Sequence, residues 1–377
     1  MIDRRHTLSL LAGAALTPSF ARAADSSLGP SLASLAAARG MRFGGVAGIA
    51  KGGLHDPKMA DLLIRECDII VPENELKMYA VQPQPGVWDF AAGDEILAFA
   101  QAHKMAMRGH NLYWAKDQYT PKWLTGRDLG AQPKTAAEGI LRDHIAHVCD
   151  HYGDRLTSWD VVNEAVDEKT GQIRDNLMLR ALGPDYLRIC FEAARQHLPK
   201  TQLVYNDYMD WTSGRAAHRK GVLDLLRWFR DNHVPVDALG IQGHVGTAQG
   251  AGQTMDPGSD GADVAAWKSF LTEVTAMGYD LLITEFDVND RRVDGDIATR
   301  DQVVAETAKI FLDVTLSFKQ VKDVLCWGLC DKYSWLQSTT PRADGLPLRP
   351  TLYDDQFQPK PLRAAFAAAL QAAPDRT

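Results

Sequence analysis

Short apolar runs of strand length alternate eight times with longer segments, several of which carry apolar residues at helical spacing. The expected strands are 41–47, 67–73, 105–112, 158–164, 202–207, 238–245, 280–287 and 324–331, and the clearest helices are 135–151, 176–197, 213–232 and 298–317. Strands that alternate with helices build a parallel sheet, and eight repeats close the sheet into a barrel. The alternation therefore predicts an α/β fold, a single-domain (β/α)8 TIM barrel.

Local signals agree with this division. Pro57 is expected in the first turn of a helix, and Gly278 is expected just beyond the end of another. No linker rich in proline or serine and no low-complexity stretch divides the chain. We therefore expect residues 24–377 to form one catalytic barrel without an appended binding module.

Polar and aromatic side chains gather where the predicted strands end. They are Glu73 and Asn74, His110, Asn163 and Glu164, Asn206 to Tyr208, Gln242 and His244, and Glu285, with Trp327 in the last strand. Barrels of this kind place their active sites at the carboxyl ends of the strands. The pattern predicts that these residues share one site.

Two glutamates carry most of the chemical information. Glu164 and Glu285 each follow an apolar run, and burying an ionised carboxylate is costly unless it is paired or used. Most glycoside hydrolases use a pair of carboxyl groups to cleave the glycosidic bond. The alternative is that both acids merely cap the helices that follow.

Composition excludes several other functions. The formal charge is −7 and the chain has no block of basic residues, which argues against nucleic acid or an anionic membrane as the main partner. The five cysteines show no zinc-ligand spacing. Cys326 and Cys330 are both expected in the last strand, about 13 Å apart and too far for a disulfide. We expect no disulfide framework, no metal and no cofactor.

The first 23 residues have the features of an export signal. Arg4 and Arg5 precede an apolar stretch from Leu8 to Leu16, and 21–23 reads Ala-Arg-Ala, a typical cleavage site. The paired arginines indicate the twin-arginine route, with an ordinary secretory signal as the alternative. The apolar stretch is too short to span a bilayer. We expect an exported bacterial protein, periplasmic or secreted, with no membrane span after the signal is removed.

Seven motifs in order resemble those of glycoside hydrolase family 10, the retaining endo-1,4-β-xylanases, over about residues 40–362. The motifs are 72–77, 108–114, 159–165, 205–208, 241–244, 283–287 and 327–335. The resemblance implies an enzyme that cleaves internal bonds of xylan. Xylan and xylo-oligosaccharides are the expected partners, and a monomer is the expected state.

The resemblance also implies roles for single residues. Glu164 matches the acid/base, Glu285 the nucleophile, and Asn163 the residue that bonds the 2-hydroxyl of the sugar at the cleavage site. His244 matches the partner of the nucleophile, with Asp287 behind it. The remaining matches are substrate-binding positions: Glu73, Asn74, Lys77, His110, Trp114, Gln242, Trp327 and Trp335 on the glycone side, Tyr208 on the aglycone side, and Asn206 beside it in the same motif.

The chain departs from the family pattern near these positions. Met78 replaces a tryptophan, Met209 replaces an asparagine, and Ala115-Lys116-Asp117-Gln118 replaces a shorter His-small-Gln sequence. The glycine-rich stretch 246–261 is longer than a tight turn needs. It shapes the aglycone side or is simply a surface loop.

Two other functions stay open at this point. One is hydrolysis of another β-1,4-linked glycan, and the other is a catalytically dead glycan-binding barrel, which the presence of both acids with Asn163 and His244 opposes. The remaining aromatic and histidine residues are assigned to structure. Trp88, Trp123, Trp159, Trp211, Trp228 and Trp267 are expected to pack, and His103, His144, His147, His151 and His197 are expected on solvated helix surfaces.

Overall fold

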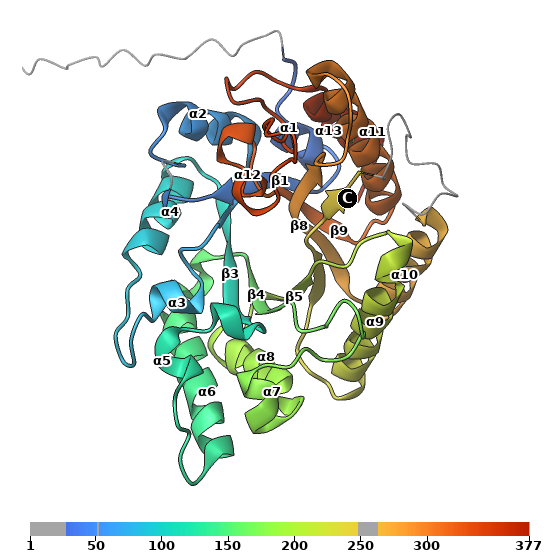
Figure 1. Cartoon of the computed structure of the whole chain (residues 1–377). Helices are drawn as coiled ribbons and strands as arrows, with labels where there is room; N and C mark the ends of the chain where they lie inside the picture. Colours follow the sequence, from blue (N-terminus) through green and yellow to red (C-terminus); the bar gives the residue numbers. More distant parts are fainter. Residues whose placement is uncertain (1–27, 51–52, 248–262, 377) are drawn as a thin grey trace, which may run out of the picture. The chain divides into compact units, whose positions relative to one another are not determined.

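The computed structural model describes residues 28–50, 53–247 and 263–376. Within residues 31–376, eight parallel strands close into a barrel in the order β1–β2–β3–β4–β5–β6–β8–β9, with β9 pairing back to β1. The eight strands are β1 Arg42–Ala47, β2 Ile69–Pro72, β3 Ala106–Trp114, β4 Ser158–Asn163, β5 Gln202–Asp207, β6 Ala238–Ile241, β8 Asp280–Asn289 and β9 Val321–Cys326, and a short additional strand, β7 His244–Gly246, pairs with β8. The predicted (β/α)8 barrel is confirmed (Figure 1).

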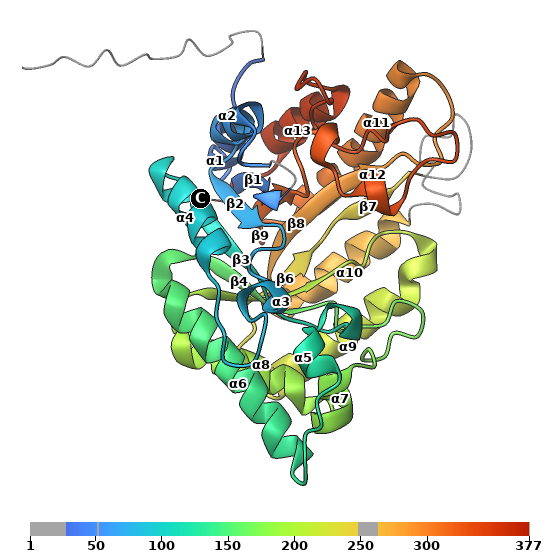
Figure 2. The same ribbon diagram turned by 60° about the vertical axis from the view of Figure 1, so that its left-hand side comes forward.

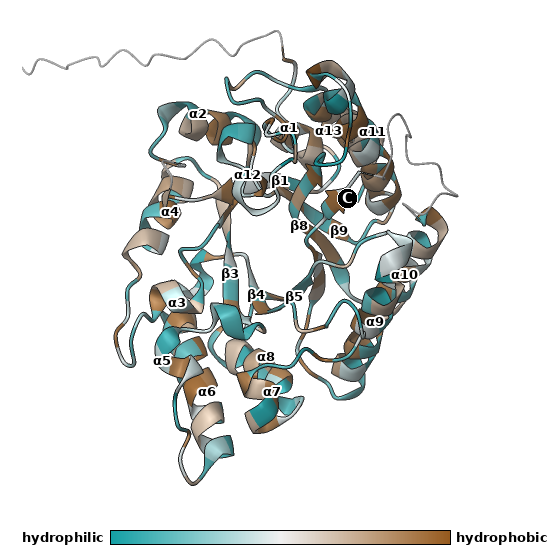
Figure 3. Cartoon of the chain, viewed as in Figure 1, coloured by the Kyte–Doolittle hydropathy of each residue, from teal (hydrophilic) through white to brown (hydrophobic). Residues whose placement is uncertain are grey.

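Helices surround this barrel, as Figures 1 and 2 show. They are α1 Leu32–Ala37, α2 Pro57–Glu66, α3 Met78–Val81, α4 Ala91–Ala102, α5 Lys122–Thr125, α6 Pro133–Tyr152, α7 Leu177–Leu182, α8 Asp185–His197, α9 Ala216–Asp231, α10 Val264–Ala276, α11 Ile297–Leu316, α12 Leu336–Thr339 and α13 Pro361–Ala372. The described residues also contain four short 3-10 turns: η2 Asp117–Tyr119, η3 Gly153–Arg155, η4 Ser213–Arg215 and η5 Asp331–Tyr333. In Figure 3, helices such as α7 and α9 carry both apolar and polar colours, as expected for helices with one packed side.

The core has two layers because successive strand residues point to opposite sides of a sheet. The outer layer packs strands against helices and forms one large apolar cluster, which includes Leu239 and Ile283. Alternate strand residues, such as Val204 and Leu282, form small separate clusters. In a closed barrel these alternate residues fill the interior. The same alternation continues past the strand ends and aims polar side chains into the mouth of the barrel.

Helix boundaries follow the expected local signals. Pro57 is the first residue of α2, where its missing N–H costs nothing, and the side chain of Asp56 accepts from the backbone N–H of Lys58. Gly278 lies two residues beyond the end of α10 with φ of +93°, a conformation that glycine adopts without strain. Both sequence expectations are confirmed.

Three predicted elements were wrong in their extent. The predicted helix 176–197 is two helices, because Gly183 adopts φ of +68° and Pro184 follows it. The predicted strand 238–245 is interrupted at Gly243, with φ of +78°, so β7 pairs only with β8. The last strand begins at Val321 and ends at Cys326, two residues before Gly328 with its φ of +119°.

The shift of the last strand also corrects the expected place of one cysteine. Cys330 lies beyond β9, so Cys326 and Cys330 do not share a strand. All five cysteines are buried and free.

One of the five histidines assigned to solvated helix surfaces is buried instead. His144 shares the inner side of α6 with Leu141, Ile145 and Val148, and its Nδ1 lies 3.1 Å from Oε1 of Gln82. Burial lowers the pKa of His144 to about 3, so the ring is neutral near pH 7. The expectation for His144 was wrong because it weighed residue type above position on the helix. The packing role of the six tryptophans is confirmed, with Trp159, Trp211 and Trp267 fully buried.

Two expectations concern residues that the structure does not describe. The predicted leader, 1–23, and all but the first residues of the glycine-rich stretch 246–261 lie outside the described ranges. Among the helices that are described, none combines the length and the apolar character needed to cross a membrane.

Candidate active site

A cleft of about 390 Å³ opens where the barrel strands end. Its lining includes every predicted site residue except Asn206 and Asp287. Six further residues line it that sequence reasoning did not assign: Tyr79, Lys116, Tyr119, Asp210, Arg215 and Thr339. The strand-end pattern therefore located the site, but it did not separate residues on the wall from residues behind it.

Glu285 lies in β8 and is held from both sides. Asn206 Nδ2 donates to its Oε1 at 2.7 Å, and His244 Nε2 lies 3.2 Å from its Oε2. Burial alone would raise the pKa of Glu285, but His110, His244 and Lys77 outweigh burial and lower this pKa to about 2. Glu285 is therefore an oriented carboxylate at neutral pH.

His244 bridges the two acids of β8. Its Nδ1 forms an ion pair with Asp287 Oδ1 at 3.0 Å, while its Nε2 faces Glu285. Burial would lower the pKa of His244, but Asp287 and Glu285 outweigh burial and raise it to about 10. The ring is an imidazolium near pH 7 and donates toward Glu285. Asp287 also accepts from Trp335 Nε1 at 2.7 Å, so it lies behind the site as the sequence predicts.

Asn206 lies behind the cleft wall instead of on it. The side chain is fully buried, and its Oδ1 accepts from the hydroxyl of Thr284 at 2.7 Å. That contact fixes the amide so that its nitrogen donates to Glu285. A Cβ on Gly240 would come within 2.3 Å of Asn206 Oδ1, so the glycine makes room for this arrangement. Asn206 positions Glu285, which corrects its expected place among residues that contact substrate.

Glu164 follows β4 with φ of +57°, which is rare for a residue with a side chain and is typical of functional sites. Its backbone is held on both sides, because its N–H donates to Asn206 O at 2.9 Å and its carbonyl accepts from Arg174 Nε at 3.1 Å. Gln242 Nε2 donates to its Oε1 at 2.9 Å, and Lys116 Nζ forms an ion pair with its Oε2. Sequence reasoning assigned no role to Arg174 or Lys116.

Asn163 lies between the two glutamates. Its side-chain amide is 3.0 Å from Asn206 Nδ2 and 3.2 Å from Gln242 Nε2, and these two amides bond Glu285 and Glu164 respectively. One continuous set of side-chain amides thus connects the two carboxyl groups and fixes their relative orientation.

One wall of the cleft combines a lysine with aromatic rings. Lys77 Nζ bonds Asn74 Oδ1 at 3.1 Å and lies 4.5 Å from the ring centre of Trp114 and 5.9 Å from that of Trp327. Burial lowers the pKa of Lys77, while the carboxylates of the site oppose this. Tyr119 stacks on the Trp114 ring at 3.6 Å. Aromatic faces beside a few polar groups suit the apolar and hydroxyl-bearing faces of a sugar.

The departures from the family pattern differ in their position. Met78 and Met209 are buried, at 5% and 0% exposure, and do not line the cleft. Ala115 is buried as well. Lys116 does line the cleft, so among these substitutions it is the one that changes the chemistry of the wall.

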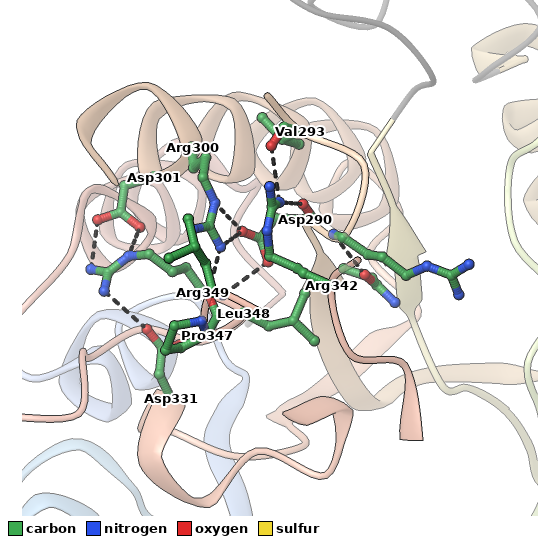
Figure 4. A network of polar contacts seen from close by, with 12 residues as sticks. Asp290, Val293, Arg300, Asp301, Asp331, Arg342, Pro347, Leu348 and Arg349 are labelled. Carbon is green, nitrogen blue, oxygen red and sulfur yellow. Dashed lines mark hydrogen bonds and ion pairs between the residues drawn. The ribbon is translucent and has the colours of Figure 1, made fainter. Parts of the chain in front are cut away.

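The loop that follows α12 is fixed by a buried network of charges, shown in Figure 4. Arg300 Nε donates to Asp290 Oδ2 at 2.8 Å, and Arg342 Nη1 donates to the carbonyl of Asp290 at 2.8 Å. Arg349 donates through its backbone to Asp290 and through its side chain to Asp301. The network ties the loop after α12 to the end of β8.

In the described residues, no group of three or more histidine, cysteine or acidic side chains is arranged to hold a metal ion. The described lining of the cleft offers carboxyl groups, an imidazolium, lysine and arginine side chains, amides and aromatic rings.

Known proteins resemble this chain over most of its length. The model of glycosyl hydrolase family 10 matches residues 31–369. Endo-1,4-β-xylanase A of Fusarium oxysporum f. sp. lycopersici is 31% identical over 78% of this chain and 85% of that protein. Endo-1,4-β-xylanase A of Thermoanaerobacterium saccharolyticum is 29% identical over 84% of this chain, which spans about a quarter (26%) of that longer protein. The structure of xylanase 10B from Thermotoga petrophila in complex with xylobiose has a TM-score of 0.80 at 28% identity, covering 90% of this chain and 97% of that one.

Proposed function

The chain belongs to glycosyl hydrolase family 10, and on that premise we propose that it is a retaining endo-1,4-β-xylanase with Glu285 as nucleophile and Glu164 as acid/base. It hydrolyses internal β-1,4-xylosidic bonds of xylan. The observation that carries the assignment is the unequal environment of the two acids. Glu285 is held as a carboxylate by His244 and Asn206, and Glu164 faces the same cleft across the amides of Asn163 and Gln242.

In the first step, Glu285 attacks the anomeric carbon while Glu164 protonates the leaving oxygen. Retention requires the two carboxyl groups to lie about 5–5.5 Å apart. Glu164 has to carry its proton for this step, because the leaving sugar departs as a hydroxyl. His244 orients the attacking carboxylate. Asn163 supplies a hydrogen bond to the sugar 2-hydroxyl that strengthens as the ring approaches an oxocarbenium ion.

In the second step, the roles of the two acids reverse. Glu285 is now an ester, and Glu164, which has given its proton to the leaving sugar, is available as a base. Glu164 takes a proton from water, and that water attacks the anomeric carbon from the face that the leaving sugar has vacated. The product keeps the β configuration, and both carboxyl groups return to their initial states.

Product analysis with the protein lacking residues 1–23 tests this function. We expect xylan and arabinoxylan to yield xylo-oligosaccharides, with the β-anomer appearing first in proton NMR spectra. Cellulose should yield little. Initial release of the α-anomer contradicts retention, and binding without hydrolysis supports a catalytically dead glycan-binding barrel.

Substrate choice gives a first mutational prediction. Lys77, Trp327 and Trp335 line the cleft beside His244 and His110, and these bulky groups crowd the hydroxymethyl arm that glucose carries and xylose lacks. We expect aryl xylobiosides to exceed aryl cellobiosides by at least about tenfold in kcat/KM, roughly 1.4 kcal/mol in the transition state. Trp335→Ala should narrow the ratio by relieving the crowding. Equal values in the unmodified protein move the assignment to a broader β-1,4-glycan specificity.

The export signal predicted from the sequence gives a second mutational prediction. We propose that residues 1–23 direct export by the twin-arginine route, because Arg4 and Arg5 precede the apolar stretch 8–16. Replacing the pair by Lys-Lys should retain precursor inside a bacterial host, with the loss measured as xylanase activity in the periplasm. Unchanged periplasmic activity indicates the general secretory route.

A further inference from the structure

Lys116 lies at the mouth of the cleft on a well-fixed piece of backbone. Its N–H donates to Trp114 O at 2.8 Å, and its carbonyl accepts from the Tyr119 N–H at 3.0 Å. The next residue, Asp117, accepts from the backbone N–H of Leu177 at 2.7 Å and pairs with Arg180. The base of the Lys116 side chain is therefore held, while its four-carbon stem can still rotate.

The ammonium group of Lys116 contacts two predicted site residues together. It forms an ion pair with Glu164 Oε2 and lies 4.7 Å from the centre of the Tyr208 ring. Tyr208 cannot turn away, because its hydroxyl accepts from Arg174 Nη2 at 2.6 Å and bonds Glu168. The ammonium therefore occupies the space between the acid/base and the ring expected to contact the aglycone sugar.

This contact opposes the first chemical step. A cation beside a carboxyl group favours its ionised form, whereas a general acid has to carry its proton. Among the other groups around Glu164, Gln242 donates to Oε1 of its carboxyl group. The Arg174 side chain bonds the backbone carbonyl of Glu164 and not its carboxyl group. Lys77 and Glu285 contribute charges at longer range. Lys116 is the cation in direct contact with the Glu164 carboxylate in the described part of the chain.

We propose that Lys116 is a positioning residue that couples the state of Glu164 to occupancy of the aglycone side. In the free enzyme it holds Glu164 as an ion pair. A sugar that packs on Tyr208 takes the place of the ammonium, and Glu164 is then free to accept its proton and deliver it to the leaving oxygen. The inference rests on the proposed function, because it assumes that Glu164 is the acid/base and that Tyr208 meets the aglycone.

The proposed coupling predicts in which direction the pH profile of kcat/KM moves when Lys116 is replaced. The basic limb of kcat/KM reports loss of the essential proton from the free enzyme. Because Lys116 favours the ionised carboxylate, replacing it by a neutral side chain should let the acid form persist to higher pH.

The experiment compares three variants with xylotetraose as substrate. Lys116→Met removes the charge and keeps much of the stem, and it should move the basic limb of kcat/KM to higher pH. Lys116→Arg keeps a cation and should leave the limb near its original position. Lys122→Met makes the same charge change at an exposed residue of α5 and should also leave the limb in place. Circular dichroism melts confirm that each variant is folded.

The possible outcomes distinguish failure of the Lys116 proposal from failure of the proposed xylanase function. A limb that stays fixed in Lys116→Met, while the unmodified enzyme cleaves xylotetraose, overturns the coupling alone. A limb that moves equally in Lys122→Met shows a general charge effect and also overturns it. Failure of the unmodified enzyme to cleave any β-1,4-xylan overturns the proposed function itself.

Discussion

Glu285→Ala is expected to lower the hydrolysis of xylan by at least about 10⁴-fold, because no other group can form the covalent intermediate. Glu285 is held as a carboxylate by Asn206 and His244, and the alanine side chain offers no nucleophilic atom in its place. The loss is measured as reducing ends released per enzyme. Glu273→Ala, at an exposed site on α10, is the matched control and should retain normal turnover.

Chemical rescue makes the test specific. The alanine leaves a space on the face from which Glu285 attacks, and the neighbouring His244 imidazolium attracts small anions. Azide should therefore restore cleavage of an activated aryl xylobioside, and the product should be an α-glycosyl azide because attack inverts the anomeric centre. Near-normal turnover without azide, or a β-glycosyl azide, contradicts the assignment of Glu285 as nucleophile.

The placement of Glu164 and Glu285 in one site could be predicted from sequence because a parallel barrel brings strand ends together whatever their separation in the chain. Glu164 and Glu285 each end an apolar run, and both line one cleft. The interior of the barrel follows from the same alternation. His144 was also within reach of sequence reasoning, since it lies between Leu141 and Val148 at helical spacing.

The second layer of the site could not be predicted in the same way. Asn206 lies behind Glu285 because Gly240, on the next strand, has no Cβ to obstruct it, and the register between β5 and β6 sets that contact. Lys116 reaches Glu164 because Asp117 is bonded to Leu177, a residue far along the chain. Contacts of this kind depend on tertiary geometry. The sequence pattern can therefore indicate that a residue lies near the site, but not which residue it contacts there.

Glu164→Ala is expected to slow the hydrolysis of xylan by about 10²–10⁴-fold, the usual contribution of general acid–base catalysis. The reason is that a leaving sugar needs a proton, and Gln242 and Asn163, the amides nearest to Glu164, cannot donate one as an acid. A dinitrophenyl xylobioside leaves without that proton, so its first step should lose far less. Single-turnover release of dinitrophenol, compared with xylotetraose cleavage, measures the difference.

The anomeric configuration of the azide product distinguishes the role of Glu164 from that of Glu285. Glu164→Ala retains Glu285, so the glycosyl-enzyme still forms, but water is no longer deprotonated and the intermediate accumulates. Azide entering the space left by Glu164 should attack this intermediate and give a β-glycosyl azide, opposite in configuration to the product expected from Glu285→Ala. Equal losses for good and poor leaving groups, or the same azide anomer from both variants, would show that the two carboxyl groups do not divide the work of double displacement.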